Sequence, residues 1–111
     1  IDTCNAYINI YNSDSLFGEV TNIGMNSEIS IGDLANLIIN LLDKDIDIIH
    51  SKERVRPKRS EVERLMCDNS KLLKHTNWEP KYTLKKGIVE VIKWMENPQN
   101  LTLFKAEQYN V

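Results

Sequence analysis

The sequence predicts an α/β fold: a small βαβ-containing fragment with about four helices and two to four short, mainly parallel strands. Two short runs rich in β-branched residues, 18–24 and 46–49, have the profile of strands. A helical pattern of apolar residues at 30–42 lies between them. Strand, helix and strand in this order indicate a parallel, right-handed βαβ unit.

Length and composition restrict the class of protein. The 111 residues carry a net charge of −2, with 41% hydrophobic and 27% charged residues, which fits one globular domain rather than a disordered or disulfide-rich chain. No apolar run approaches the roughly 18 residues that span a bilayer. The near-neutral charge argues against general binding of nucleic acid. Because Ile1–Cys4 resembles no targeting signal, we expect a cytoplasmic fragment of a longer protein.

The first half of the chain begins with a helix. Its residues Ile1, Cys4, Ile8 and Tyr11 share one helix face, and 12–15 break the pattern. The 18–24 strand follows. The next helix is expected to start at the Ser30-x-x-Asp33 capping box, with an apolar stripe of Ile31, Leu34, Ala35, Ile38, Leu41 and Leu42.

The second half shows one irregular segment and two more helices. Residues 51–67 lack a helical period and are interpreted as an extended loop that ends in a strand at 62–67. Asp68 is expected to cap a short helix, and Asn77 to take the left-handed conformation after it. Thr83 is expected to cap the last helix, which Asn97-Pro98 stops. Residues 98–111 form a tail without a clear pattern.

The cysteines and histidines do not indicate a metal site. Cys4 and Cys67 have no C-x-x-C spacing and are interpreted as reduced thiols that pack as small apolar groups. His50 and His75 have no partner at a ligand spacing.

The unusual feature is a basic cluster at 52–59, which holds five of the 14 basic residues. In an extended backbone Lys52, Arg54, Arg56 and Lys58 point to the same side, and Pro57 disfavours a helix at Arg56. Cations held together favour an anion, and an arginine can bind a phosphate through two hydrogen bonds. The alternatives are a solvated loop, or a non-enzymatic interaction module whose loop 52–59 binds an acidic protein or RNA.

Six segments in order resemble the C-terminal part of the NAD-dependent epimerase/dehydratase family, which consists of extended short-chain dehydrogenases/reductases acting on nucleotide sugars. The segments that carry the resemblance are Gly18–Gly24, Glu28–Ile31, Arg56-Pro57 with Ser60–Val62, Asp68–Lys71, Asn77–Pro80, and Leu84 with Gly87. The resemblance implies a nucleotide-sugar-binding C-terminal lobe over residues 1–97, in a 4,6-dehydratase or 4-epimerase.

The resemblance also implies which residues bind substrate. Arg56 matches the family's diphosphate-contacting arginine, and Glu61 matches the acidic residue that contacts the ribose. Arg54 and Lys58 are expected to assist. The implied partners are a UDP-, dTDP- or GDP-linked sugar and an N-terminal dinucleotide-binding domain.

The same resemblance implies that this chain is catalytically incomplete. Its four glycines do not form the G-x-x-G-x-x-G loop that would hold NAD or NADP in the parent enzyme. None of Tyr7, Tyr11, Tyr82 and Tyr109 is nominated as the base of the family's Tyr-x-x-x-Lys pair. A lobe without its companion domain leaves apolar surface uncovered, so we expect self-association into a homo-oligomer or marginal stability.

Overall fold

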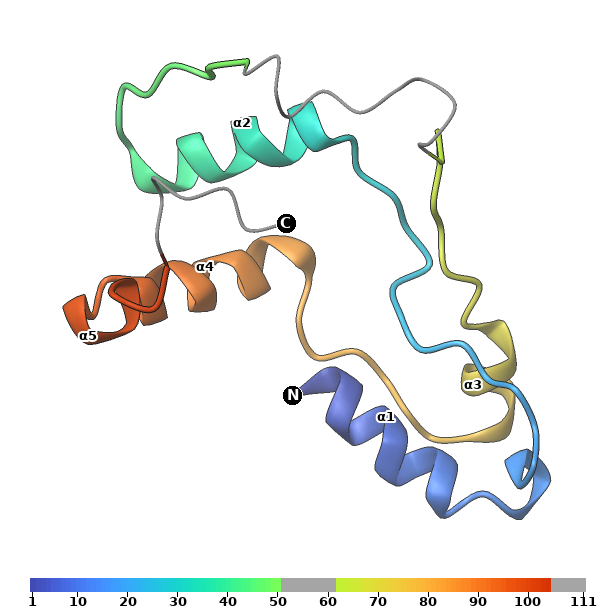
Figure 1. Ribbon diagram of the computed structural model, residues 1–111. Coiled ribbons are helices and arrows are strands. Elements are labelled where there is room, and N and C mark those ends of the chain that lie inside the picture. The colour runs from blue at the N-terminus through green and yellow to red at the C-terminus, as the bar shows by residue number, and fades with distance from the viewer. Residues whose placement is uncertain (51–61, 105–111) are drawn as a thin grey trace.

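The computed structural model describes residues 1–50 and 62–104, and its regular elements there are all helical (Figure 1). They are α1 (Asp2–Tyr11), the 3₁₀ turn η1 (Asp14–Leu16), α2 (Ile31–Leu42), α3 (Ser70–His75), α4 (Leu84–Met95) and α5 (Pro98–Leu101). No strand occurs in these two ranges. The predicted α/β fold with a βαβ unit is therefore wrong.

Side chains of α3 and of its N-cap residue donate to two backbone carbonyls of residues 18–24. Lys71 Nζ donates to Val20 O at 2.9 Å, and Asn69 Nδ2 donates to Gly24 O at 2.8 Å. A strand requires the backbone of a second strand as its partner. The predicted strands at 46–49 and 62–67 are also irregular, and their apolar side chains are largely exposed.

The helices form two groups (Figure 1). In the first group α1, η1 and α3 lie close together, and the segment that joins α3 to α4 runs beside α1. In the second group α2 lies over α4, and α5 follows α4. The radius of gyration is 17.7 Å, against about 13 Å for a compact domain of this length, so the arrangement is open.

The core lies in the first group. Its buried residues are Ala6, Leu16, Leu72 and Trp78, and the half-buried Ile10 and Ile23 pack against them. Trp78 Nε1 donates to Asp2 O at 3.0 Å, and the Asp2 carboxylate accepts from the Tyr82 N–H at 2.9 Å. These two bonds join the start of α1 to the segment before α4.

The predicted helix starts at Ser30 and Thr83 are confirmed. The Asp33 N–H donates to Ser30 Oγ at 3.0 Å, and the Ser30 hydroxyl donates to the Asp33 carboxylate at 2.7 Å. The Lys86 N–H donates to Thr83 Oγ1 at 3.3 Å. The N-cap of α3 is Asn69 rather than the predicted Asp68, although the Asp68 carboxylate accepts from the Ser70 N–H at 3.0 Å from one position before the cap.

The helix ends differ from the predictions. Asn77 is not left-handed: α3 ends at Thr76 in extended backbone (φ −140°, ψ 168°), and the only described non-glycine residue with positive φ is Asp43, at the end of α2. In the predicted tail, Asn97 caps the short helix α5 by accepting from the Gln99 N–H at 3.0 Å. An asparagine therefore begins a helix in a stretch that showed no pattern.

Replacing Ser30 with alanine is expected to destabilise α2 by about 1 kcal/mol, because the Asp33 N–H loses its acceptor. Amide hydrogen exchange of the first turn of α2 measures this change. Ser27→Ala is the matched control, since Ser27 is exposed and precedes the cap by three residues. Equal exchange rates in the two variants would contradict a capping role for Ser30.

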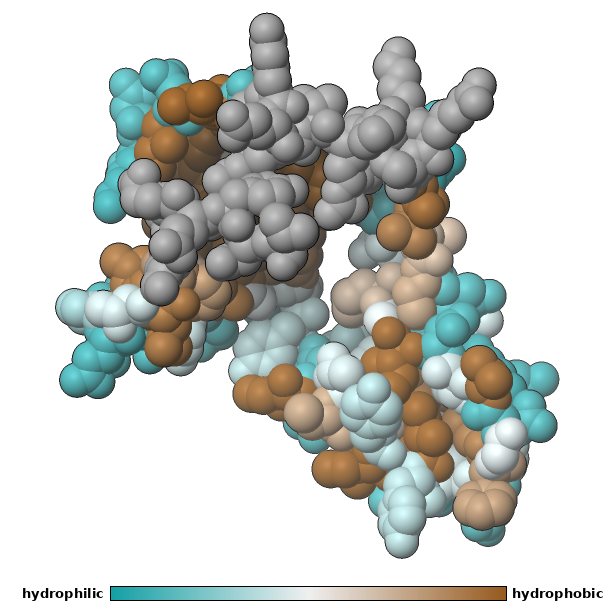
Figure 2. Space-filling model, viewed as in Figure 1, coloured by the Kyte–Doolittle hydropathy of each residue, from teal (hydrophilic) through white to brown (hydrophobic). Residues whose placement is uncertain are grey.

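Apolar residues are widely exposed in both groups (Figure 2). Tyr11, Phe17 and Val20 are more than 85% exposed, and neither α2 nor α4 contains a buried residue. Self-association through this surface stays a prediction.

Candidate substrate-binding surface

The four residues predicted to bind substrate lie outside the described residues: Arg54, Arg56, Lys58 and Glu61. The structure describes the chain on either side of them, up to His50 and again from Val62. A substrate-binding surface that includes the 52–59 cluster would therefore adjoin these two ends.

An ion pair holds the chain at one of these ends. Arg64 Nε donates to both carboxylate oxygens of Glu28 at 3.1 Å, and Arg64 Nη2 also contacts Glu28. The hydrogen bond to Glu28 raises the pKa of Arg64 above its ordinary value. Because the Arg64 side chain is 79% exposed, solvent screens the pair and it contributes little to the stability of the fold. Its effect is to fix residues 62–65 against the start of α2.

A groove of about 660 Å³ lies between these two segments. It is lined by Glu28, Ile29, Ser30, Ile31, Asp33, Val62, Glu63, Arg64 and Leu65. Three carboxylates face one guanidinium in this lining, so its formal charge is negative and it disfavours a phosphate. Binding of a diphosphate here would depend on the cations of the 52–59 cluster.

Sequence reasoning did not predict the pairing of Glu28 with Arg64. The two residues are 36 positions apart, and neither belongs to a local motif that would have joined them. Arg64 lies in a segment that was interpreted as a strand, which assigned it no partner.

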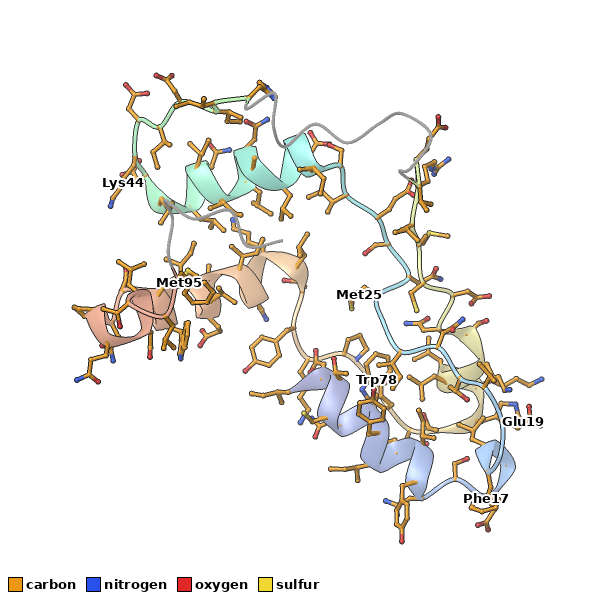
Figure 3. All side chains as sticks on the ribbon, in the orientation of Figure 1. Phe17, Glu19, Met25, Lys44, Trp78 and Met95 are labelled. Carbon is orange, nitrogen blue, oxygen red and sulfur yellow. The ribbon has the colours of Figure 1, made fainter. Side chains whose placement is uncertain are left out.

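A second hollow of about 620 Å³ lies between α2 and α4 and is almost entirely apolar. Met25, Ile38, Ile88, Val91 and Met95 are among its lining residues, and Figure 3 shows Met25 and Met95 on different sides of this region. Glu28 and Tyr82 are its only lining residues with a titratable side chain. The hollow therefore suits apolar groups.

Two carboxylates whose pKa values are lowered bind residues of α3. Lys71 Nζ donates to Glu19 at 2.9 Å, and this hydrogen bond together with the lysine charge lowers the pKa of Glu19. The Ser70 hydroxyl and backbone N–H lower the pKa of Asp68. Both groups are exposed and face structural partners, so they are not candidates for an acid or a base.

One tyrosine does precede a lysine by four residues, namely Tyr82 before Lys86. Thr83 caps α4, which begins at Leu84, so Tyr82 lies outside the helix that contains Lys86. The two residues are therefore not one turn apart on a helix. The sequence therefore contains the spacing, but the two side chains do not lie one turn apart on the same helix. We assign the pair no catalytic role.

Cys4, Cys67, His50 and His75 were interpreted from the sequence as forming neither a disulfide nor a metal site. Both thiols are free, but only Cys67 is packed, against Gly24, whereas Cys4 is exposed. Among residues 1–50 and 62–104, no three His, Cys, Asp or Glu side chains are grouped as metal ligands. No helix in the same part of the chain is long and apolar enough to cross a membrane.

Comparison with known proteins identifies relatives of this sequence. It is 33% identical over 79 residues to a putative UDP-glucose 4-epimerase of Methanocaldococcus jannaschii. The aligned region covers 71% of this chain and 24% of that relative. It is 31% identical over 87 residues to dTDP-glucose 4,6-dehydratase of Xanthomonas campestris pv. campestris, covering 69% and 24%. It is 32% identical over 76 residues to a probable GDP-L-fucose synthase 1 of Oryza sativa subsp. japonica, covering 68% and 22%.

The chain thus spans about a quarter of the length of these curated relatives. No family model matches the sequence. No solved structure matches it either.

Proposed function

The chain belongs to the NAD-dependent epimerase/dehydratase family, and we propose that it is a substrate-binding portion of an enzyme that acts on a nucleotide sugar. The reaction class that we propose for the parent enzyme is 4,6-dehydration or 4-epimerisation. We place the lobe at residues 1–97.

The observation that carries this proposal is the chemistry shared by the relatives' names. They specify UDP-glucose, dTDP-glucose and GDP-L-fucose, which carry three different bases and two different sugars but share a diphosphate. A portion of sequence common to all three is therefore best suited to recognise the diphosphate. Five of the chain's 14 basic residues are in the 52–59 cluster, which makes that cluster the natural ligand for it.

Within the cluster we assign the main contact to Arg56. Its guanidinium can donate two parallel hydrogen bonds to a phosphate, and Arg54 and Lys58 lie on the same side in an extended backbone. Glu61 is assigned to the ribose hydroxyls, which a carboxylate can accept from. Binding energy from these groups, which are remote from the reacting carbon, would position the sugar for reaction.

NAD or NADP is proposed for the parent enzyme, but the residues of this chain do not fit either cofactor. Gly18, Gly24, Gly32 and Gly87 are too far apart to form a dinucleotide-binding loop. We therefore assign the cofactor to an N-terminal dinucleotide-binding domain of the parent enzyme. A homo-oligomeric parent is also part of the proposal.

Replacing Arg56 with alanine is expected to weaken binding of UDP, dTDP or GDP about tenfold, because a charged hydrogen-bonding pair is lost. Titration of the 111-residue chain, followed by NMR, measures the dissociation constants. UDP is expected to bind more tightly than UMP, since it carries the second phosphate.

Arg59→Ala is the matched control, because it removes the same charge from a position that an extended backbone would place on the opposite side from Arg56. Equal weakening by the two variants would show that only the overall charge matters and would contradict the assignment. Tight RNA binding with a steep salt dependence would instead support the interaction module.

A further inference from the structure

Two adjoining polar hollows follow α1 on the side that faces the segment between α3 and α4. One, of about 360 Å³, is lined by Asn9, Asn12, Ser13, Lys74, His75, Thr76 and Asn77. The other, of about 600 Å³, is lined by Asn5, Asn9, Asn77, Trp78, Glu79, Pro80 and Lys81. Asn9 and Asn77 line both, so the two hollows adjoin, and we call them together the asparagine groove.

Carboxamides are regularly spaced along this groove. Asn5 and Asn9 lie on α1 and Asn12 is its C-cap. They are four and three residues apart, which separates them by about 6 Å and about 4.5 Å along the helix axis. Each carboxamide offers both donors and an acceptor. One N–H of Asn9 donates to Asn5 O at 2.8 Å, and the group retains a second N–H for a ligand.

Hydrogen bonds fix the opposite wall of the groove to α1 and its C-terminal extension. Ser13 Oγ donates to His75 O at 3.0 Å, and Ser15 Oγ lies 3.1 Å from His75 Nδ1. At the other end, Trp78 Nε1 donates to Asp2 O at 3.0 Å. Figure 3 shows Trp78 between α1 and this segment. A groove held at both ends loses little entropy when a ligand binds.

The charges at the two ends favour an anion. Lys74 belongs to the hollow that contains Asn12, and Lys81 belongs to the hollow that contains Asn5. Glu79 is the only carboxylate in the combined lining. A ligand that spans the groove would therefore meet a lysine at each end and amides between them.

We propose that the asparagine groove binds a short, extended segment of an acidic peptide. An extended backbone repeats its N–H and C=O groups every two residues, about 6.6 Å, which is close to the spacing from Asn5 to Asn9. The distance from Asn5 to Asn12 along α1, about 10 Å, accommodates about three peptide residues. Acidic side chains at the two ends of that segment would pair with Lys74 and Lys81. The groove involves none of the residues assigned to the nucleotide sugar.

Titration of the 111-residue chain with the peptide acetyl-Glu-Ala-Ala-Glu-amide tests the proposal by NMR. We expect the side-chain amide signals of Asn5, Asn9, Asn12 and Asn77 to shift, with a dissociation constant in the millimolar range. The Asn12→Ala and Asn77→Ala variants are each expected to weaken binding at least about threefold. Added salt is expected to weaken it further, because exposed charges are screened.

Asn36→Ala is the matched control, since Asn36 is an exposed asparagine on α2, outside the groove. Equal loss in Asn36→Ala, or equal binding of acetyl-Lys-Ala-Ala-Lys-amide, would overturn the proposal. Binding of neutral maltotetraose at these asparagines without binding of the acidic peptide would also overturn it, in favour of a carbohydrate site. Binding of UDP tests the proposed function separately, through Arg56.

Discussion

Replacing Trp78 with alanine is expected to unfold the group formed by α1, η1 and α3. Trp78 is 4% exposed and is the largest of the four buried core residues. Removing such a side chain costs about 3–5 kcal/mol, which is a large part of the stability of a typical domain. The indole hydrogen bond to Asp2 O is lost as well. Urea denaturation followed by circular dichroism measures the loss.

Trp94→Ala is the matched control for this experiment. Trp94 is 46% exposed and makes an edge-to-face contact with Phe104, with ring centroids 6.1 Å apart. Its removal is therefore expected to cost less than half as much. Trp78→Phe separates the two contributions, because it keeps a ring but removes the N–H donor. A Trp78→Ala midpoint equal to that of the unchanged protein would show that this core does not stabilise the chain.

Replacing Gly24 with alanine is expected to destabilise the protein by about 1–3 kcal/mol through overpacking. A Cβ at this position would lie 2.9 Å from both Cβ and Sγ of Cys67. The neighbouring carbonyl cannot move away freely, because Gly24 O accepts a hydrogen bond from Asn69 Nδ2. The same urea experiment measures the effect.

The clash makes a specific prediction for a double variant. Cys67→Gly removes both atoms in the way, so Gly24→Ala is expected to cost less in that background. Gly87→Ala is the control: an added Cβ there meets nothing within 4 Å, and alanine is expected to stabilise α4 by up to about 1 kcal/mol. Simple additivity of Gly24→Ala and Cys67→Gly would contradict the close contact.

Local signals predicted the helices well because the groups that start them are neighbours in the sequence. Ser30 and Asp33 are three residues apart, as are Thr83 and Lys86, and both pairs form the expected caps. The resemblance to the NAD-dependent epimerase/dehydratase family is likewise confirmed by the relatives. The assignment of Arg54, Arg56, Lys58 and Glu61 stays a prediction.

Long-range contacts could not be predicted from local patterns. The 18–24 segment has the composition of a strand, but whether it becomes one depends on the neighbour that its backbone meets. Here Lys71 and Asn69, about 50 residues away, donate to its carbonyls. The Glu28–Arg64 pair was missed for the same reason, because nothing in the sequence around Glu28 indicates Arg64.

The bonds from Asp2 to Trp78 and Tyr82 have a consequence for biosynthesis. They link residues 76 and 80 positions apart, so the contact order of this core is high and its closure requires a long loop. During translation α1 leaves the ribosome well before Trp78 and Tyr82 have been synthesised. The nascent helix must therefore remain without its Trp78 and Tyr82 partners until the polypeptide has been extended beyond Tyr82. A chaperone would have most to protect during this interval.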